Sequence, residues 1–142
     1  MAPSHVLVPL DGSPMAEAAL THALETFECR VTVLNVVTSI DAGMSEGNLV
    51  DVAPEESTAR ERAEEVIDDA TAQAEAADRE IETVVRTGDP ADVIHAFVTE
   101  HDVDHVVMGS HGGDAGRIAR RLLGTVATAV VGEVPVPVTV VR

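Results

Sequence analysis

Glycines crowd one stretch of the chain, where Gly109, Gly112, Gly113 and Gly116 follow a short apolar run that ends at Met108. A glycine-rich loop after a strand can bring backbone N–H groups close to an anion, because glycine has no Cβ atom. If a helix follows the loop, its N-terminus adds a partial positive charge. The stretch therefore suggests a phosphate site, although a cluster of glycines also serves simply to make a tight turn.

Five short apolar runs rich in valine predict the strands that would hold this loop in place. Their ranges are His5–Leu10, Val31–Val37, Ile81–Thr87, Asp104–Met108 and Val136–Val141. Between them, apolar residues recur three and four positions apart, which is helical spacing. Strands that alternate with helices predict an α/β protein, in which helices cover both faces of a doubly wound, five-stranded parallel sheet.

The expected helices have recognisable ends. Ser13 and Asp89, each followed by a proline, are good N-caps, and Pro54 is expected to open the longest helix. The last helix is expected to run from about Arg117 to Val131, and Gly132 is a plausible cap at its C-terminus.

Ligands of such sheets bind at the carboxyl ends of the strands, where the strand order reverses. If the first and fourth strands are neighbours, Asp11 would share this crevice with the loop that begins at Gly109. The connection Ser39–Pro54 has no clear period and is long for a compact domain, so it is either a lid or a surface loop. No internal repeat or second domain is visible, and residues 1–142 are expected to form one domain.

The composition is strongly acidic, with 25 acidic residues, nine basic residues that are all arginine, and a net charge of −16. Such a chain repels itself at ordinary salt, whereas molar salt shortens the screening length to roughly 3 Å. The acids are spread along the chain, which favours adaptation to a high-salt, halophilic cytoplasm over the alternative of an acidic protein that binds a basic partner.

Other compositional features bear on location and partners. No basic patch or aromatic platform is visible, which argues against nucleic acid as a partner. No apolar run approaches the length of a membrane span, and no secretory signal is visible at the N-terminus. The single cysteine, Cys29, fits a reducing cytoplasm.

Several known sites are excluded by their missing residues. A P-loop requires a lysine, and the chain has none. The dinucleotide fingerprint should follow the first strand, whereas these glycines follow the fourth. Ser110 and His111 are adjacent and lack a nucleophile elbow, and His111 with Asp114 has no second cluster of metal ligands.

The chain resembles the universal stress protein family over nearly its whole length. HVLVPLDGS and the helix after it resemble the family's first strand, PxDGS turn and first helix, and VTVLNVV resembles its second strand, where His often replaces Asn35. The most specific piece is GDPADVIHAFVTEHDVDHVVMGSHG, and RRLLGTVATAVV with VPVPVTVVR resembles the final helix and strand. The resemblance implies an adenine nucleotide alpha hydrolase-like fold with strand order 3-2-1-4-5, usually dimeric.

Many members of this family bind ATP through a G-x2-G-x9-G-[ST] motif after the fourth strand. The resemblance implies that Asp11 would hold the ribose or a phosphate associated with a metal such as Mg²⁺, and that Val36 would line the adenine. The implied nucleotide-binding residues are Pro9, Asp11, Val36, Met108, Gly109, Gly112, Gly124, Thr125 and Val126.

One departure from the motif is the spacing after Gly112, because eleven residues rather than nine precede Gly124. The longer loop either bulges outward and keeps the site or places Asp114 against the phosphates, where its carboxylate would repel them unless Mg²⁺ intervened. Arginines at positions 117, 120 and 121 either supply positive charge there or face solvent.

Three functions follow from the residues and the resemblance. The first is a cytoplasmic stress-response protein that binds ATP at the carboxyl ends of strands 1 and 4 and acts as a nucleotide-regulated dimeric switch, with at most slow hydrolysis. The second is a family member without nucleotide binding that acts as an interaction or protective module. The third, an adenylyl-transferring enzyme, has no recognisable catalytic motif. The unprotected edge Val138–Val141 is expected to pair across the dimer.

Overall fold

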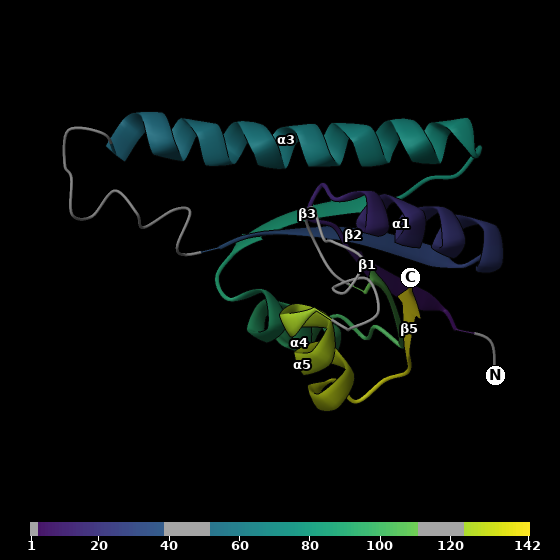
Figure 1. Ribbon diagram of the computed structural model, residues 1–142. Helices are drawn as coiled ribbons and strands as arrows, with labels where there is room; N and C mark the ends of the chain where they lie inside the picture. The colour runs from purple at the N-terminus through teal and green to yellow at the C-terminus, as the bar shows by residue number, and fades with distance from the viewer. Residues whose placement is uncertain (1–2, 39–51, 111–123) are drawn as a thin grey trace.

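A parallel sheet with strand order β3-β2-β1-β4-β5 forms the centre of the protein (Figure 1). The computed structural model describes residues 3–38, 52–110 and 124–142, and for residues 52–57 the backbone only. The elements are β1 His5–Pro9, α1 Pro14–Thr26, β2 Arg30–Val37, α3 Val52–Ala76, β3 Glu82–Thr87, α4 Pro90–Glu100, β4 His105–Gly109, α5 Thr125–Glu133 and β5 Val138–Val141. The predicted fold class and strand order are therefore confirmed.

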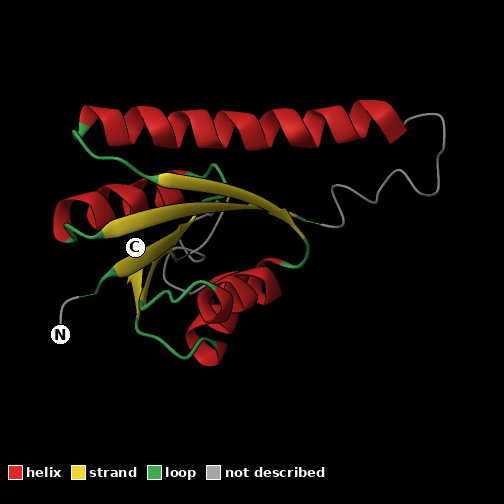
Figure 2. Cartoon of the chain, turned by 180° about the vertical axis from the view of Figure 1, so that it is seen from behind, coloured by secondary structure: helices red, strands yellow, loops and turns green. Residues whose placement is uncertain are grey.

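Helices cover both faces of the sheet, as predicted (Figure 2). On one face α1 and α3 pack over a cluster that includes Val6, Val8 and Leu20. On the other face α4 and α5 pack over a second cluster that includes Leu7 and Ile94. Successive side chains of a strand point to opposite faces, and β1 is buried on both, so its central residues Val6, Leu7 and Val8 are all apolar.

The predicted caps of α1 and α4 are confirmed. Ser13 Oγ accepts a hydrogen bond from the N–H of Ala16 at 3.2 Å, and Asp89 Oδ2 accepts one from the N–H of Asp92 at 3.1 Å. Each cap is followed by proline, whose missing N–H would have had no intrahelical partner in the first turn. Both helices therefore begin where their local sequence dictates.

Three predicted helix boundaries are wrong. Helix α3 begins at Val52 rather than at Pro54, which is compatible with proline because the first turn needs no N–H donor from it. Helix α5 begins at Thr125, because Gly124 is extended (φ −67°, ψ 167°), and it runs to Glu133 rather than ending at Val131. Residues 117–123 of the expected helix lie outside the described residues.

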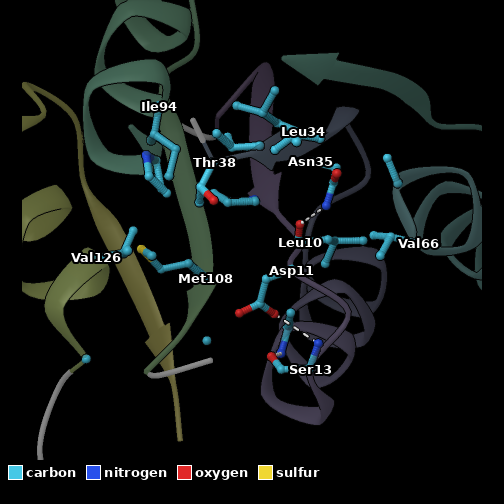
Figure 3. A pocket seen from close by; sticks show the side chains of 18 of the residues that line it. Leu10, Asp11, Ser13, Leu34, Asn35, Thr38, Val66, Ile94, Met108 and Val126 are labelled. Atoms are coloured by element: carbon cyan, nitrogen blue, oxygen red, sulfur yellow. Dashed lines mark hydrogen bonds between the residues drawn. The ribbon is translucent and has the colours of Figure 1, made fainter. Parts of the chain in front are cut away.

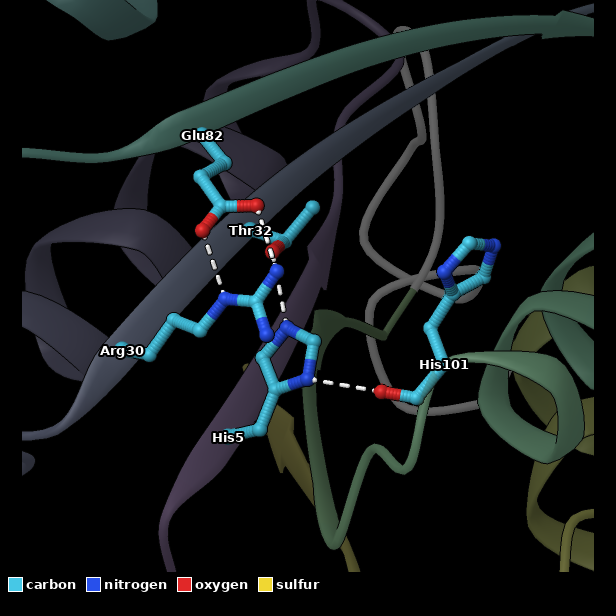
Figure 4. Close-up of polar contacts among 5 residues, drawn as sticks. All are labelled: His5, Arg30, Thr32, Glu82 and His101. Carbon is cyan, nitrogen blue, oxygen red and sulfur yellow. Dashed lines mark hydrogen bonds and ion pairs between the residues drawn. The ribbon is translucent and has the colours of Figure 1, made fainter.

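The amino ends of the strands carry a polar cluster of their own (Figure 4). The ring of His5 is buried, with Nδ1 3.1 Å from the carbonyl oxygen of His101 and Nε2 2.8 Å from Thr32 Oγ1. Arg30 forms a two-pronged ion pair with Glu82 on the neighbouring strand, at 2.5 and 2.7 Å. These groups lie at the amino ends of the strands. The glycine-rich stretch begins at the opposite, carboxyl ends.

Arg79, in the connection between α3 and β3, closes the end of α1. Its guanidinium donates hydrogen bonds to three carbonyl oxygens, those of Leu24 at 2.7 Å, Phe27 at 2.7 Å and Cys29 at 2.9 Å. The last carbonyls of a helix lack intrahelical partners and carry partial negative charge. One arginine thus satisfies an end of α1 that has no basic residue of its own in its last turn.

Candidate functional site

A cavity of about 440 Å³ lies at the carboxyl ends of β1, β2 and β4. Figure 3 shows Met108 and Val126 on one side of it, Leu10 and Val66 on the other, and Asp11 between them. The two sides belong to the two hydrophobic clusters on opposite faces of the sheet. The cavity thus opens where the sheet ends and the helices of its two faces diverge, which is where ligands of doubly wound sheets bind.

Eight of the nine residues that the sequence implied for a nucleotide site line this one cavity. They come from β1 and its turn, from β2, from β4 and from the start of α5, and are Pro9, Asp11, Val36, Met108, Gly109, Gly124, Thr125 and Val126. The ninth, Gly112, lies outside the described residues, as do Asp114 and the arginines at 117, 120 and 121.

The turn after β1 holds Asp11 at the cavity. Asp11 Oδ1 accepts a hydrogen bond from the N–H of Ser13 at 2.9 Å, closing an Asx turn. Gly12 between them has φ +83°, a left-handed conformation that glycine adopts without the cost other residues incur. The sequence Asp-Gly-Ser is thus required locally, and it leaves the Asp11 carboxylate exposed at the cavity wall.

Asn35 on β2 fixes the end of β1 from the next strand. Its Nδ2 donates to the carbonyl oxygen of Leu10 at 2.8 Å, while the N–H of Leu10 donates to the carbonyl oxygen of Leu34 at 2.9 Å. Both polar groups of Leu10, one residue before Asp11, are therefore held by β2. Asn35 is buried and lines the cavity, so its amide couples β2 to the position of Asp11.

Gly109 has a packing reason to be glycine. A Cβ atom at this position would lie 2.9 Å from the carbonyl carbon of Met15 and 2.9 Å from its Cβ. The first turn of α1 thus approaches the end of β4 more closely than a side chain permits. Close helix packing and a close approach of ligand are both compatible with glycine here.

The start of α5 is joined to the end of β4 through Ser110. The carbonyl oxygen of Ser110 accepts a hydrogen bond from the N–H of Gly124 at 2.5 Å, and its own N–H donates to the carbonyl oxygen of Val141 at 2.9 Å. These bonds place Gly124 beside Gly109 at the cavity although fourteen residues separate them in sequence. The buried Ser110 hydroxyl has no hydrogen-bond partner within the described part of the chain.

The N-terminus of α5 is left without a side-chain cap. Gly124 provides none, and the first turn contains no acidic residue. The N–H of Thr128 is bonded to the carbonyl oxygen of Gly124, whereas the N–H groups before it have no intrahelical acceptor by the geometry of a helix. An uncapped helix N-terminus at a cavity can hold an anion.

Helix α3 forms the remaining wall. Ala59, Arg62, Ala63 and Val66 line the cavity from one side of this helix, since residues three and four apart share a face. Val66 also packs over the turn after β1, where its Cγ2 lies 3.2 Å from the place a Cβ of Gly12 would occupy.

Arg62 and Asn35 were not among the site residues expected from the sequence. Each had a signal that sequence reasoning could have used. Asn35 is an amide inside an otherwise apolar strand, and a buried amide needs a partner. Arg62 lies three residues after Ala59 and four before Val66, so it borders the apolar stripe of α3.

The described residues were compared with the requirements of a metal site and of a membrane span, and meet neither. Among them, no three His, Cys, Asp or Glu side chains lie together in a way that would hold a metal ion. Over the same ranges, no helix has both the length and the apolar character needed to cross a membrane.

The sheet order, the helices on both faces and the cavity at the switch point define a doubly wound α/β protein with a cavity at the carboxyl edge of its sheet. The sequence model described as "Universal stress protein family" matches residues 3–142. The chain therefore belongs to the universal stress protein family.

Solved structures support the same conclusion about the fold. Hypothetical protein MJ0577, solved as a test case of structural genomics, is 25% identical, with a TM-score of 0.80 over 97% of this chain and 94% of that one. A universal stress protein family protein from Arabidopsis thaliana with AMP bound is 21% identical, with a TM-score of 0.70 over 98% and 91%. The universal stress protein from Archaeoglobus fulgidus in complex with dAMP is 21% identical, with a TM-score of 0.68 over 100% of both chains. A search of curated protein sequences found no significant match.

Proposed function

We propose that this protein binds an adenine nucleotide, with ATP as the physiological ligand, in the cavity at the carboxyl ends of β1, β2 and β4. The observation that carries the proposal is the convergence of eight residues, implied by the family resemblance, on one cavity of about 440 Å³. Ligand pockets for molecules of drug or nucleotide size usually have volumes of about 300–1,000 Å³.

The chemistry of the walls suits the parts of a nucleotide. Val36, Met108 and Val126 offer apolar surface for the flat face of a base. Asp11 provides acceptors for the ribose hydroxyls, or a single carboxylate for a cation that accompanies the phosphates, as Mg²⁺ commonly does. The uncapped start of α5, with Thr125 beside it, provides N–H donors for a phosphate.

Relatives of this fold support adenine nucleotides as the ligand class, because the Arabidopsis thaliana and Archaeoglobus fulgidus structures contain AMP and dAMP. The further assignment of ATP rests on the ends of the family motif, Gly109 and Gly124-Thr125, which both line the cavity. The longer spacing between them is tolerated in this proposal, with Gly112 contributing as in other members.

The first experiment is a measurement of nucleotide content and affinity in molar KCl with Mg²⁺. The purified protein is denatured, the supernatant is analysed by HPLC, and ATP, ADP, AMP and adenosine are titrated by calorimetry. We expect bound or co-purified adenine nucleotide and a loss of binding in Asp11→Ala. A protein that is empty and binds none of these at millimolar concentration would refute the proposal.

We further propose a dimeric, nucleotide-regulated role in the stress response of a high-salt cytoplasm. Strand β5 is an edge strand bonded to β4 on one side, and its four residues remain half-exposed, so antiparallel pairing of Val138–Val141 with a second copy would cover it. Nucleotide would regulate the dimer only through a difference in affinity between two states. Light scattering in molar KCl, with and without ATP, tests this, and a monomer under both conditions would contradict it.

A second candidate is a family member without nucleotide, acting as an interaction or protective module. The observation that favours it is the contact between Gly109 and Met15, which accounts for this glycine without any ligand. The same calorimetric titration separates the two candidates, because the second predicts no binding of any adenine compound.

A further inference from the structure

The residues expected at the cavity supply no full positive charge to balance the phosphate groups of a nucleotide. The chain has a net charge of −16, and Asp11, the expected charged contact, is itself an anion. A phosphate group placed beside this carboxylate is repelled unless positive charge lies nearby. The start of α5 supplies only a partial charge, equivalent to about half a unit.

Arg62 is an arginine that lines the cavity, on α3. Two other described arginines are engaged elsewhere: Arg30 pairs with Glu82 at the amino ends of the strands, and Arg79 donates to three carbonyl oxygens at the end of α1. Arg62 forms no ion pair with any residue that the structure describes. Arg62 is an exposed residue and is therefore available to a ligand in the cavity.

The position of Arg62 follows from how α3 crosses the sheet. Val66 packs on the turn after β1 that carries Asp11, and Arg62 lies one turn earlier on the same face of the helix. Side chains of a helix point toward its N-terminus, and α3 is the next described element after β2. Arg62 thus lines the cavity from the side of α3 that carries Val66, while the neighbouring Ala63 is buried.

We propose that Arg62 pairs with the phosphate groups of the bound ligand, so that the ligand links α3 to the turn carrying Asp11. This inference rests on the proposed function, which supplies the adenine part of the ligand. The contact of Arg62 concerns only the phosphate part and can be tested independently. It predicts that the site prefers phosphorylated ligands to adenosine, and that the preference depends on one residue of α3.

Arg60 provides a matched control on the same helix. It is exposed, lies two residues from Arg62 on the opposite side of the helix, and is absent from the cavity wall. Arg62→Ala and Arg60→Ala each remove one positive charge from the same acidic chain. Both replace arginine by alanine on the same helix, so the change in intrinsic helix propensity is also the same. Any difference between them therefore reports position and not net charge.

The test is calorimetric titration of wild type, Arg62→Ala, Arg60→Ala and Arg62→Lys. Each protein is titrated with ATP, adenosine and inorganic tripolyphosphate. The titrations are made in molar KCl and at the lowest salt concentration at which the protein keeps its native circular dichroism spectrum. We expect Arg62→Ala to weaken ATP and tripolyphosphate roughly tenfold, as for one charge-assisted hydrogen-bonded contact. Adenosine affinity should not change, and Arg60→Ala should bind like wild type. Arg62→Lys should recover part of the loss, because it keeps the charge but not the planar fork.

Three results would overturn the inference. One is equal ATP affinity in Arg62→Ala and Arg60→Ala, and another is an equal loss for ATP and adenosine in Arg62→Ala. The third is a wild-type affinity for ATP no higher than for adenosine. In each of these cases wild-type protein still binds an adenine compound, so the adenine site of the proposed function stands, whereas the third result would contradict its assignment to ATP. Wild type that binds tripolyphosphate through Arg62 but no adenine compound would refute the proposed function and support the inference, and absence of all binding would refute both.

Discussion

Replacing Gly109 by alanine separates the two explanations of this glycine. The added Cβ would lie 2.9 Å from both the carbonyl carbon and the Cβ of Met15, and 3.0 Å from its carbonyl oxygen. Two of these three atoms are backbone, so no flexible side chain can move aside, and α1 must shift away from β4. Forcing extra volume into a close-packed contact typically costs about 1–3 kcal/mol. We therefore expect Gly109→Ala to lower the free energy of unfolding by that amount without any nucleotide present.

Gly132, near the end of α5, is the matched control. A Cβ there would meet nothing within 4 Å, and alanine is favoured over glycine inside a helix by about 0.5–1 kcal/mol. Gly132→Ala should thus raise stability while Gly109→Ala lowers it.

Thermal unfolding followed by circular dichroism in nucleotide-free molar KCl, at fixed protein concentration, measures both effects. For a chain of this size, 1 kcal/mol corresponds to roughly 4 °C in Tm, so the expected decrease for Gly109→Ala is roughly 4–12 °C. A variant that unfolds at the wild-type temperature but no longer binds nucleotide would refute the packing explanation. Gly109 would then be required for the approach of the ligand.

Three further changes test individual contacts. Asn35→Ala leaves the carbonyl oxygen of Leu10 without its buried donor and should cost about 1–3 kcal/mol in urea unfolding; an unchanged midpoint would contradict the role of Asn35. Arg79→Met removes three hydrogen bonds to carbonyls at the end of α1 and should cost about 2–3 kcal/mol, with faster hydrogen exchange in the last turn of α1, whereas exchange at the wild-type rate would argue against it. Hydrogen bonds from the backbone N–H of Ser4, with others from His5 N–H and the Ser4 hydroxyl, hold the pKa of Asp104 below its ordinary value of 3.8. Asp104 therefore stabilises the fold above that ordinary pKa, and the contribution is lost as pH falls through the lower folded pKa. Asp104→Asn should flatten the acid limb of the stability profile, and an unchanged acid limb would count against this.

The elements of the fold follow largely from local sequence. The valine-rich runs predicted buried strands, and Ser13-Pro14 and Asp89-Pro90 predicted helix starts. Both kinds of prediction succeed because hydrophobic periodicity and helix capping depend only on residues close together in the sequence. Alternation of strands and helices then implied a parallel sheet. The predicted start of α5 is wrong because it relied on local spacing alone. Apolar residues recur at helical spacing on both sides of Gly124, but the backbone of Gly124 is extended and its N–H is bonded to Ser110.

The residues of the candidate site could be named from the sequence only through resemblance to a family motif. That eight of them line one cavity depends on β1 and β4 being neighbours, which is a property of chain topology and not of any single stretch. The strand order also brings Asn35 against Leu10, a contact between residues that are 25 positions apart.

By itself the sequence determined the α/β class, the acidic character and the Asp-Gly-Ser turn, because each depends on composition or on neighbours along the chain. Only the tertiary structure decided that Gly109 packs against α1, that Asn35 fixes the end of β1, and that Arg62 of α3 faces the same cavity as Asp11. The physical reason is that these relations arise between elements distant in sequence. Their geometry is set by how the sheet orders its strands and where each helix crosses it, which no local pattern encodes.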